Sequence, residues 1–202
     1  MQKYIIGGIV IVILLAAGYL VWQNASRVPA QEPESQVQLP AVHTYASSTF
    51  SIVYPDRYTV NENYKYEGVP KKSISGVSFL IPEAMTTGTN LSASDTGVSV
   101  EQLPRAQKCT GDIFIYENVK AADLTIGSKT FSMASTSGAA AGNLFEERVF
   151  AVKGSHPCTA VRYFIHSTNI GNYGTSTPVR EFDHAKLLAD FGKIRDSLEL
   201  NQ

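Results

Sequence analysis

The chain of 202 residues has only two cysteines and lacks any surplus of positive charge. Two cysteines are too few for a small fold that depends on several disulfides. Lys and Arg number 17 against 18 Asp and Glu, which gives a net charge of -1 with neutral histidines. A nucleic-acid-binding protein needs clustered positive charge to displace counterions from phosphates, so we expect no nucleic acid among the partners.

Metal and phosphate motifs are absent as well. The four histidines show neither the His-x-x-x-His nor the His-Glu-x-x-His spacing that is typical of zinc sites. The sequence contains no Asp-x-Asp-x-Asp-Gly calcium loop and no glycine-rich phosphate-binding loop. We therefore expect neither a metal nor a cofactor. The hydrophobic content of 44% is enough for one domain with a real core.

An uncharged run of 19 residues extends from Tyr4 to Trp22. As a helix it would be roughly 28 Å long, close to the hydrocarbon thickness of a bilayer. Lys3 and the positive-inside rule place residues 1–3 in the cytoplasm and the chain beyond Trp22 outside. The run predicts an N-terminal transmembrane helix over residues 4–22, a signal anchor in contact with the lipid bilayer. The protein would then be a single-pass protein of a cell membrane, with an extracytoplasmic C-terminal domain.

A cleaved signal peptide is the alternative to this anchor. Val28, Pro29 and Ala30 resemble a cleavage site, although the apolar run exceeds the 7–15 residues typical of signal peptides. Residues 23–42 contain three prolines and several glutamines and predict an extended tether. The remaining residues, 43–202, suit one domain. The chain after Arg27 carries 15 basic and 18 acidic residues, a balance that does not attract anionic lipid or nucleic acid.

The domain alternates between β-rich segments and turn residues. Strands are predicted at 50–54, 74–81, 98–103 and 129–134. Two further β-rich runs, 143–153 and 158–168, flank a short turn and predict a β-hairpin. In the second run Val161, Tyr163 and Ile165 alternate with Arg162, Phe164 and His166. In the first run we expect Glu146 and Arg148 to face solvent.

Three other segments complete the predicted architecture. Residues 105–118 favour a short helix, and Ser135–Gly142 is rich in small residues and predicts a flexible connection. Asp183 is a suitable N-cap for a final helix, whose apolar residues recur at helical spacing and are Leu187, Leu188, Phe191, Ile194 and Leu198. Strands followed by a late helix predict an α+β fold, an antiparallel sheet with a C-terminal amphipathic helix packed on it.

Two short segments resemble a known family. Thr-Phe-Ser-Ile-Val-Tyr-Pro-Asp-Arg-Tyr at 49–58 and Phe-Gly-Lys-Ile-Arg-Asp-Ser-Leu at 191–198 look like the ends of PsbP/Mog1-like domains. The likeness covers about 20 residues, and a Trp is usual in that family where this chain has Tyr58. The resemblance implies a sandwich with an antiparallel sheet, and a protein that binds or scaffolds.

Cys109 and Cys158 both follow the predicted anchor. An even pair in an oxidising compartment predicts a disulfide. Closing a separation of 49 residues would stabilise the fold by roughly 4 kcal/mol in the chain-entropy model. The bond would hold segment 105–118 against the hairpin.

A catalytic alternative uses the same cysteine. Ser155-His156-Pro157-Cys158 with Arg162, and the segment around His166, resemble the Ser-His-Gly-Cys-x-Arg and Ile-His-Gly-Thr motifs of L,D-transpeptidases. Cys158 would be the nucleophile, His156 or His166 its base, and Arg162 an anion contact. The order of the two motifs is reversed here, Pro157 replaces a glycine, and the arginine is displaced by two positions.

The loop at 169–175, rich in Gly and Asn, follows the second run of the hairpin. Loops in such positions often carry recognition, so Asn169, Asn172 and Tyr173 are candidate binding residues, although the loop also suits an ordinary connection. The favoured interpretation is a non-catalytic binding or scaffolding protein of a cell envelope, and the expected partner is an envelope protein, a glycan or a small ligand. The alternatives are the cysteine transpeptidase and a purely structural spacer.

Overall fold

The computed structural model describes residues 41–174 and 176–201. The predicted cytoplasmic segment 1–3, the predicted anchor 4–22 and nearly all of the predicted tether 23–42 therefore lie outside the described residues. Within the described ranges, no helix is long and apolar enough to cross a membrane.

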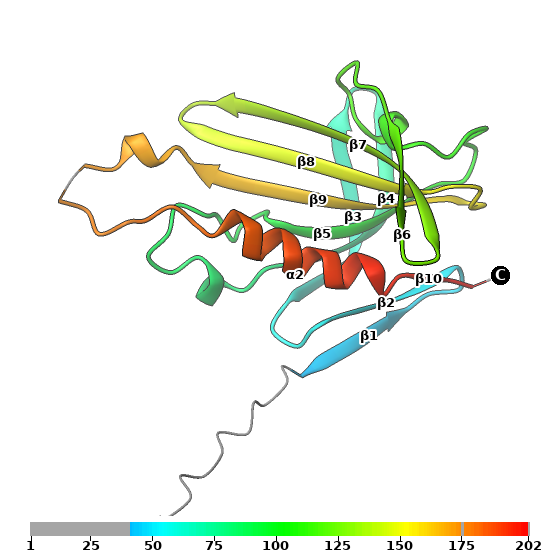
Figure 1. The fold of residues 1–202 in the computed structure, drawn as a ribbon, viewed down its shortest axis with the longest axis horizontal. Coiled ribbons are helices and arrows are strands. Elements are labelled where there is room, and N and C mark those ends of the chain that lie inside the picture. Colours follow the sequence, from blue (N-terminus) through cyan, green and yellow to red (C-terminus); the bar gives the residue numbers. More distant parts are fainter. Residues whose placement is uncertain (1–40, 175, 202) are drawn as a thin grey trace, which may run out of the picture. The chain divides into compact units, whose positions relative to one another are not determined.

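Seven strands form one antiparallel sheet (Figure 1). Their order across the sheet is β3-β4-β5-β9-β8-β7-β6. The strands are β3 (Thr59–Val69), β4 (Lys72–Leu80), β5 (Gly97–Leu103), β6 (Ala122–Ile126), β7 (Lys129–Ala140), β8 (Asn143–Val152) and β9 (Cys158–Thr168). The predicted hairpin is confirmed, because β8 and β9 pair directly along almost their whole length.

A second, smaller sheet and one helix complete the fold. The small sheet has the order β1-β2-β10, with β1 (Val42–Ala46), β2 (Phe50–Pro55) and β10 (Glu199–Leu200). Helix α2 (His184–Asp196) begins after Asp183, whose side chain accepts a hydrogen bond of 2.9 Å from the backbone N–H of Lys186. The antiparallel sheet with a C-terminal helix is thus the α+β arrangement that the sequence predicts.

Helix α2 and strand β2 pack against one face of the large sheet. Leu187, Phe191 and Ile194 of the helix join a core that includes Val161, Tyr163 and Ile165 of β9, as the alternation in that strand predicts. Ser197, directly after the helix, donates a hydrogen bond to the carbonyl of Val53 and accepts one from its N–H. The end of the helix is therefore fastened to β2.

The same face corrects an expectation about β8. Glu146 and Arg148 are half-buried on the helix side, where they were expected to face solvent. Glu146 accepts hydrogen bonds from Arg148 and from His184, at 2.5 and 2.7 Å. Glu146 and Arg148 are partly shielded from solvent because the first turn of α2, which contains His184, lies over this part of β8.

The opposite face of the sheet is covered at only one end. Residues 104–121 cross it near Cys158, and Phe114 and Ile115 are buried there. Cys109 and Cys158 form a disulfide with Cα atoms 5.1 Å apart, which holds this segment on the sheet as expected.

Within that segment the expected helix over 105–118 is wrong. Only a single 3-10 turn forms, η2 (Gly111–Phe114). The carbonyls of Ile113 and Phe114 accept hydrogen bonds from the side chains of Lys72 and Arg162, each at 2.8 Å. Contacts to distant strands therefore satisfy backbone groups that a local helix would otherwise have paired.

The expected flexible connection at 135–142 is also wrong. Strand β7 continues to Ala140, paired residue for residue with β8, and only Ala141 and Gly142 form the turn, both with positive φ. Backbone ladder hydrogen bonds do not depend on side-chain size, so small residues extend a strand when a partner strand is present.

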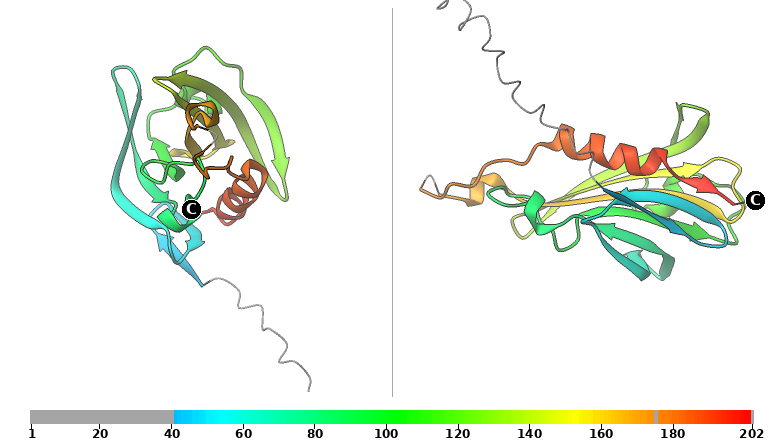
Figure 2. Two further views of the ribbon diagram at one scale, coloured as in Figure 1. Left: turned by 90° about the vertical axis from the view of Figure 1, so that its left-hand side faces the viewer. Right: turned by 90° about the horizontal axis from the view of Figure 1, so that it is seen from below.

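The large sheet is strongly curved, as the views in Figure 2 show. Gly76 and Gly97 lie where β4 and β5 bend closely past their neighbours. A Cβ on Gly76 would lie 2.2 Å from the carbonyl oxygen of Val100, and one on Gly97 would lie 2.4 Å from that of Phe79. Only glycine permits this approach of backbones, and the curvature brings β3 over the uncovered part of the second face.

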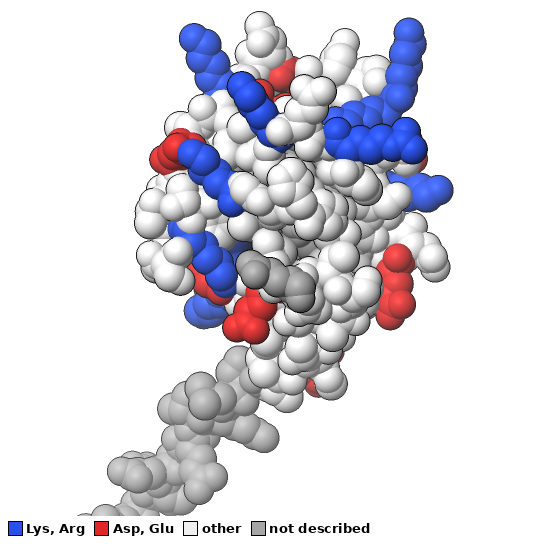
Figure 3. Space-filling model, turned by 90° about the vertical axis from the view of Figure 1, so that its right-hand side faces the viewer, with Lys and Arg blue, Asp and Glu red and all other residues white. Residues whose placement is uncertain are grey.

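Charge is distributed unevenly over the domain. Figure 3 views the end from which the β8–β9 turn projects, and basic side chains outnumber acidic ones on that face. Turns and loops at this end carry Lys71, Arg105, Lys108 and Lys153. Lys153 pairs with Asp123 at 2.6 Å. The net charge of -1 for the whole chain therefore coexists with a local excess of basic side chains at this end (Figure 3).

Candidate ligand-binding trough

The structure places Cys158 in the disulfide, with 1% of the residue exposed. Neither cysteine is free. Sulfur in a disulfide has no proton to lose and cannot act as a thiolate nucleophile. In this oxidation state the protein cannot carry out the chemistry of the transpeptidase hypothesis.

The other residues of that hypothesis are spread along β9 and the turn before it. His156 is exposed in the β8–β9 turn, near Cys158. Arg162 and His166 lie four and eight residues along the same strand, so they are about 13 and 26 Å from Cys158 at a rise of roughly 3.3 Å per residue. The structure therefore does not bring Cys158, Arg162 and His166 together.

The candidate loop after β9 is organised by its asparagines. Asn169 accepts a hydrogen bond of 2.9 Å from the N–H of Gly171 and caps the 3-10 turn η3 (Ile170–Asn172). The side chain of Asn172 donates to the carbonyl of Gly142, which joins the loop to the β7–β8 turn. Tyr173 is half-buried. Both asparagines thus have structural roles, and their part in ligand binding stays a prediction.

A trough of about 440 Å³ lies on the uncovered part of the second sheet face. This volume is typical of a site for a small molecule. The walls come from β3 and from residues that precede β5, and the floor from β4, β5, β8 and β9. The lining residues are Asn61, Tyr64, Lys65, Tyr66, Glu67, Gly68, Ser78, Leu80, Ser94, Asp95, Gly97, Val98, Ser99, Glu147 and Phe164.

Small residues in the middle of the floor leave space for the trough. Strand pairing places Ser78, Ser99 and Gly97 on the face that also carries Arg162 and Phe164. Larger side chains line the trough on β3, at Leu80 of β4, and at Glu147 and Phe164. Phe164 contacts Phe145 with ring centroids 6.1 Å apart. An aromatic wall beside a polar floor can orient a ligand with both apolar and polar groups.

A buried ionic cluster lies next to this floor. Arg162 and Glu101 are fully buried and form two parallel hydrogen bonds, of 2.7 and 2.9 Å. The same guanidinium also donates to Glu147, whose side chain is 15% exposed. Ser99 donates to Glu101 at 2.8 Å. One positive charge is thus shared by two carboxylates.

Tyr66 covers this cluster from β3. Its ring centroid lies 3.5 Å from the Arg162 guanidinium carbon, a cation–π contact, and its hydroxyl donates to both oxygens of Glu147 at 2.8 Å. Burial raises the pKa of Tyr66, and burial of the neighbouring Tyr64 raises its pKa as well, so both hydroxyls stay neutral at physiological pH.

A second acidic group stands at the mouth of the trough. Asp95 is half-exposed and its carboxylate contacts Nδ1 of His166 at 2.7 and 2.9 Å. The His166 ring stacks on Phe145 with centroids 4.6 Å apart. Its Nε2 atom is buried and has no hydrogen-bond partner among the described residues. His166, expected as a catalytic base, instead positions the carboxylate of Asp95.

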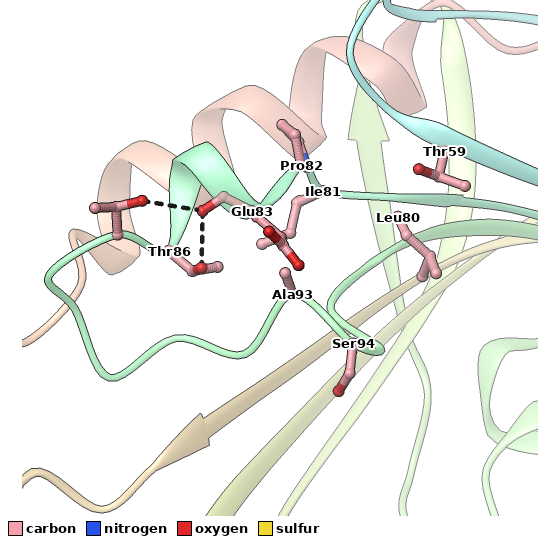
Figure 4. Close-up of a pocket in the computed structure, with 9 residues that line it drawn as sticks. Thr59, Leu80, Ile81, Pro82, Glu83, Thr86, Ala93 and Ser94 are labelled. Atoms are coloured by element: carbon pink, nitrogen blue, oxygen red, sulfur yellow. Dashed lines mark hydrogen bonds between the residues drawn. The ribbon is translucent and has the colours of Figure 1, made fainter.

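A wider hollow adjoins the trough (Figure 4). It has a volume of about 580 Å³ and shares Leu80 and Ser94 with the trough. Among the described residues that line it, Glu83 alone is charged. Glu83 lies in the 3-10 turn η1 (Glu83–Met85), and its backbone carbonyl accepts hydrogen bonds from the side chains of Thr86 and Thr87. With few converging polar groups, this hollow is better suited to extend a ligand than to hold its specific end.

The trough was not predicted from the sequence, although two residues beside it were candidates. Arg162 and His166 were predicted for another chemistry. Four further residues were not among the predicted site residues: Tyr64, Tyr66, Glu101 and Glu147. The signal was present in part, because alternation in β9 places Arg162 and Phe164 on one face. Strand β3, which supplies the aromatic wall, was not predicted at all.

Comparisons with known proteins give little further information. No protein-family model matches the chain, and no curated protein matches it. A crystal structure of a protein from Bacteroides thetaiotaomicron is similar with a TM-score of 0.40 and 14% sequence identity. The similar region covers 76% of this chain and 45% of the other, so this chain spans less than half the length of that protein. The resemblance to PsbP/Mog1-like domains stays a prediction.

Proposed function

We propose that the protein is a non-catalytic binding protein of a cell envelope, anchored by residues 4–22, whose extracytoplasmic domain holds a small ligand in the trough. The observation that carries this proposal is the trough itself. Aromatic side chains from β3 and β9 face converging polar groups in a cavity of about 440 Å³. The anchor and tether predicted from the sequence would keep this domain at the membrane surface.

Rigidity of the domain also supports a binding role. The disulfide joins the loop over the Cys158 end to β9, and the buried Arg162 cluster joins β9 to β5 and β8. A site whose walls are held in place loses little conformational entropy when a ligand binds. Neither feature depends on a reactive group.

The test is a ligand screen on the full-length protein in detergent micelles. Amines, neutral sugars and short peptides would be added separately, and backbone amide shifts would be followed by NMR. We expect at least one probe to shift the amides of Gly97, Ser99 and Phe164 together. If every probe leaves these three amides unchanged, the trough is not a binding site for these ligand classes and the proposal fails.

A pair of variants separates binding in the trough from binding elsewhere. Ser94→Trp adds a bulky ring at an exposed position that lines both hollows, and it should abolish the shifts. Ser48→Trp makes the same change at an exposed position in the β1–β2 turn and should leave them intact. Equal behaviour of the two variants would contradict a site in the trough.

A further inference from the structure

The charge around the trough is unbalanced. Two permanent cations, Lys65 and Arg162, stand among four carboxylates, which are Glu67, Asp95, Glu101 and Glu147. Counting only Lys, Arg, Asp and Glu side chains, the site has two more carboxylates than cations. Water screens the two innermost carboxylates poorly, because Glu101 is fully buried and the side chain of Glu147 is only 15% exposed.

Arg162 cannot neutralise both of its partners. Its Nε and Nη2 atoms donate hydrogen bonds to Glu101, and Nη2 also donates to the carbonyl of Phe114. Only Nη1 reaches Glu147. A guanidinium carries one unit of charge, so one of the two carboxylate charges remains without compensation at the floor of the trough.

The aromatic side chains suit the same kind of ligand. Rings attract cations through the negative potential of their faces, and Tyr66 already does this with Arg162 at 3.5 Å. Phe164 lines the trough and is half-buried, so its ring borders the space above the floor. Two carboxylates, Glu147 at the floor and Asp95 at the mouth, border the same space.

We infer that the trough binds an organic cation, an ammonium group that carries apolar carbons, in preference to a neutral or anionic ligand of the same shape. The ammonium group would lie between Phe164 and the carboxylates of Glu147 and Asp95. The carbons would fill the space above Gly97 and Ser99. This inference rests on the proposed function and names its ligand class.

Three probes of similar shape test it. Choline carries a quaternary ammonium, 3,3-dimethylbutan-1-ol replaces the nitrogen by carbon, and 3,3-dimethylbutanoate carries a negative charge. Binding to the full-length protein in micelles would be followed through the amides of Gly97 and Ser99. We expect choline to bind about tenfold more tightly than the alcohol, and the butanoate to show no binding. Equal affinities for choline and the alcohol would overturn the inference.

Variants identify the groups responsible. Asp95→Asn removes a half-exposed carboxylate, and Glu147→Gln removes the charge at the floor while Glu101 still holds Arg162. Each should weaken choline at least threefold and leave the alcohol unchanged. Glu199→Gln makes a matched change on exposed β10 and should alter neither affinity. Choline affinity that is unchanged in both trough variants would also overturn the inference.

The outcomes distinguish this inference from the proposed function. If the alcohol or a sugar shifts the trough amides and choline does not, the ligand class is wrong and the trough is still a binding site. If none of the probes used in either experiment shifts those amides, both proposals fail.

Discussion

Arg162 and Glu101 are diagonal neighbours on adjacent strands, and both side chains are fully buried. Glu101 pairs with Ala160 and Arg162 pairs with Ser99, so the two long side chains reach across the ladder to form two parallel hydrogen bonds. The geometry is the bidentate arrangement in which guanidinium and carboxylate fit best. Two opposite charges thus lie inside the domain, where removal of one partner would leave the other charge uncompensated.

The first prediction concerns this pair. Arg162→Met should lower the free energy of unfolding by about 3–5 kcal/mol, because it leaves Glu101 and Glu147 near each other without their shared cation. Urea denaturation of the full-length protein measures the change. Arg57→Met, at an exposed position before β3, is the control and should change stability by less than about 0.5 kcal/mol. Similar stability of the two variants would show that the cluster is not a stabilising element.

The second prediction concerns the disulfide. Without reductant, neither cysteine should react with an alkylating agent, and after reduction and unfolding the intact mass should show two modifications. Rapid alkylation of Cys158 without reductant would contradict the disulfide and revive the cysteine nucleophile as the hypothesis to test.

Removing the bond should also cost stability. The double variant Cys109→Ser and Cys158→Ser should lose roughly 2–5 kcal/mol, because the unfolded chain regains the freedom of a loop that spans 49 residues. The midpoint of urea denaturation would be measured for the native protein and for the double variant, each with and without reductant. Reductant should lower the midpoint of the native protein and leave that of the double variant unchanged.

The third prediction concerns the start of helix α2. Asp183→Ala should destabilise the protein by about 1 kcal/mol, since the N–H of Lys186 loses its capping partner. Glu181→Ala removes another exposed carboxylate two residues earlier, outside the helix, and should have no effect. Thermal unfolding of the two variants side by side provides the measurement.

The fourth prediction concerns pH. Burial alone would raise the pKa of Asp190, but hydrogen bonds from Lys186 and Lys193 outweigh it and hold the pKa below its ordinary value. A carboxyl group with a lowered pKa in the folded state contributes stability above its unfolded pKa, and this contribution is lost as the pH falls through the folded pKa.

Asp190→Asn should therefore reduce the loss of stability on acidification below about pH 5. Urea denaturation at several pH values between neutral and strongly acidic measures the slope. Glu199→Gln is the control, and its slope should equal that of the native protein. An Asp190→Asn slope equal to both would show that the lysine contacts do not persist in solution.

Elements with a periodic apolar pattern in their own sequence were predicted correctly, and elements that depend on pairing with distant residues were not. Strand β9 and helix α2 were predicted because their apolar spacing has the period of a strand and of a helix. The segment 135–140 was misassigned because its pairing with β8, rather than its own small side chains, makes it a strand. Strand β3 was missed because most of its residues are exposed and it lacks a regular apolar face.

The sequence by itself determined the elements whose signals are local. These are the hairpin, the cap and apolar stripe of α2, and the pair of cysteines that had only each other as partners. Only the tertiary structure decided the trough. Tyr66 and Glu147 are 81 residues apart in the chain, and Arg162 and Glu101 are 61 apart. Alternation within a strand places a residue on one face of a sheet, but strand order, register and curvature decide which residues share that face.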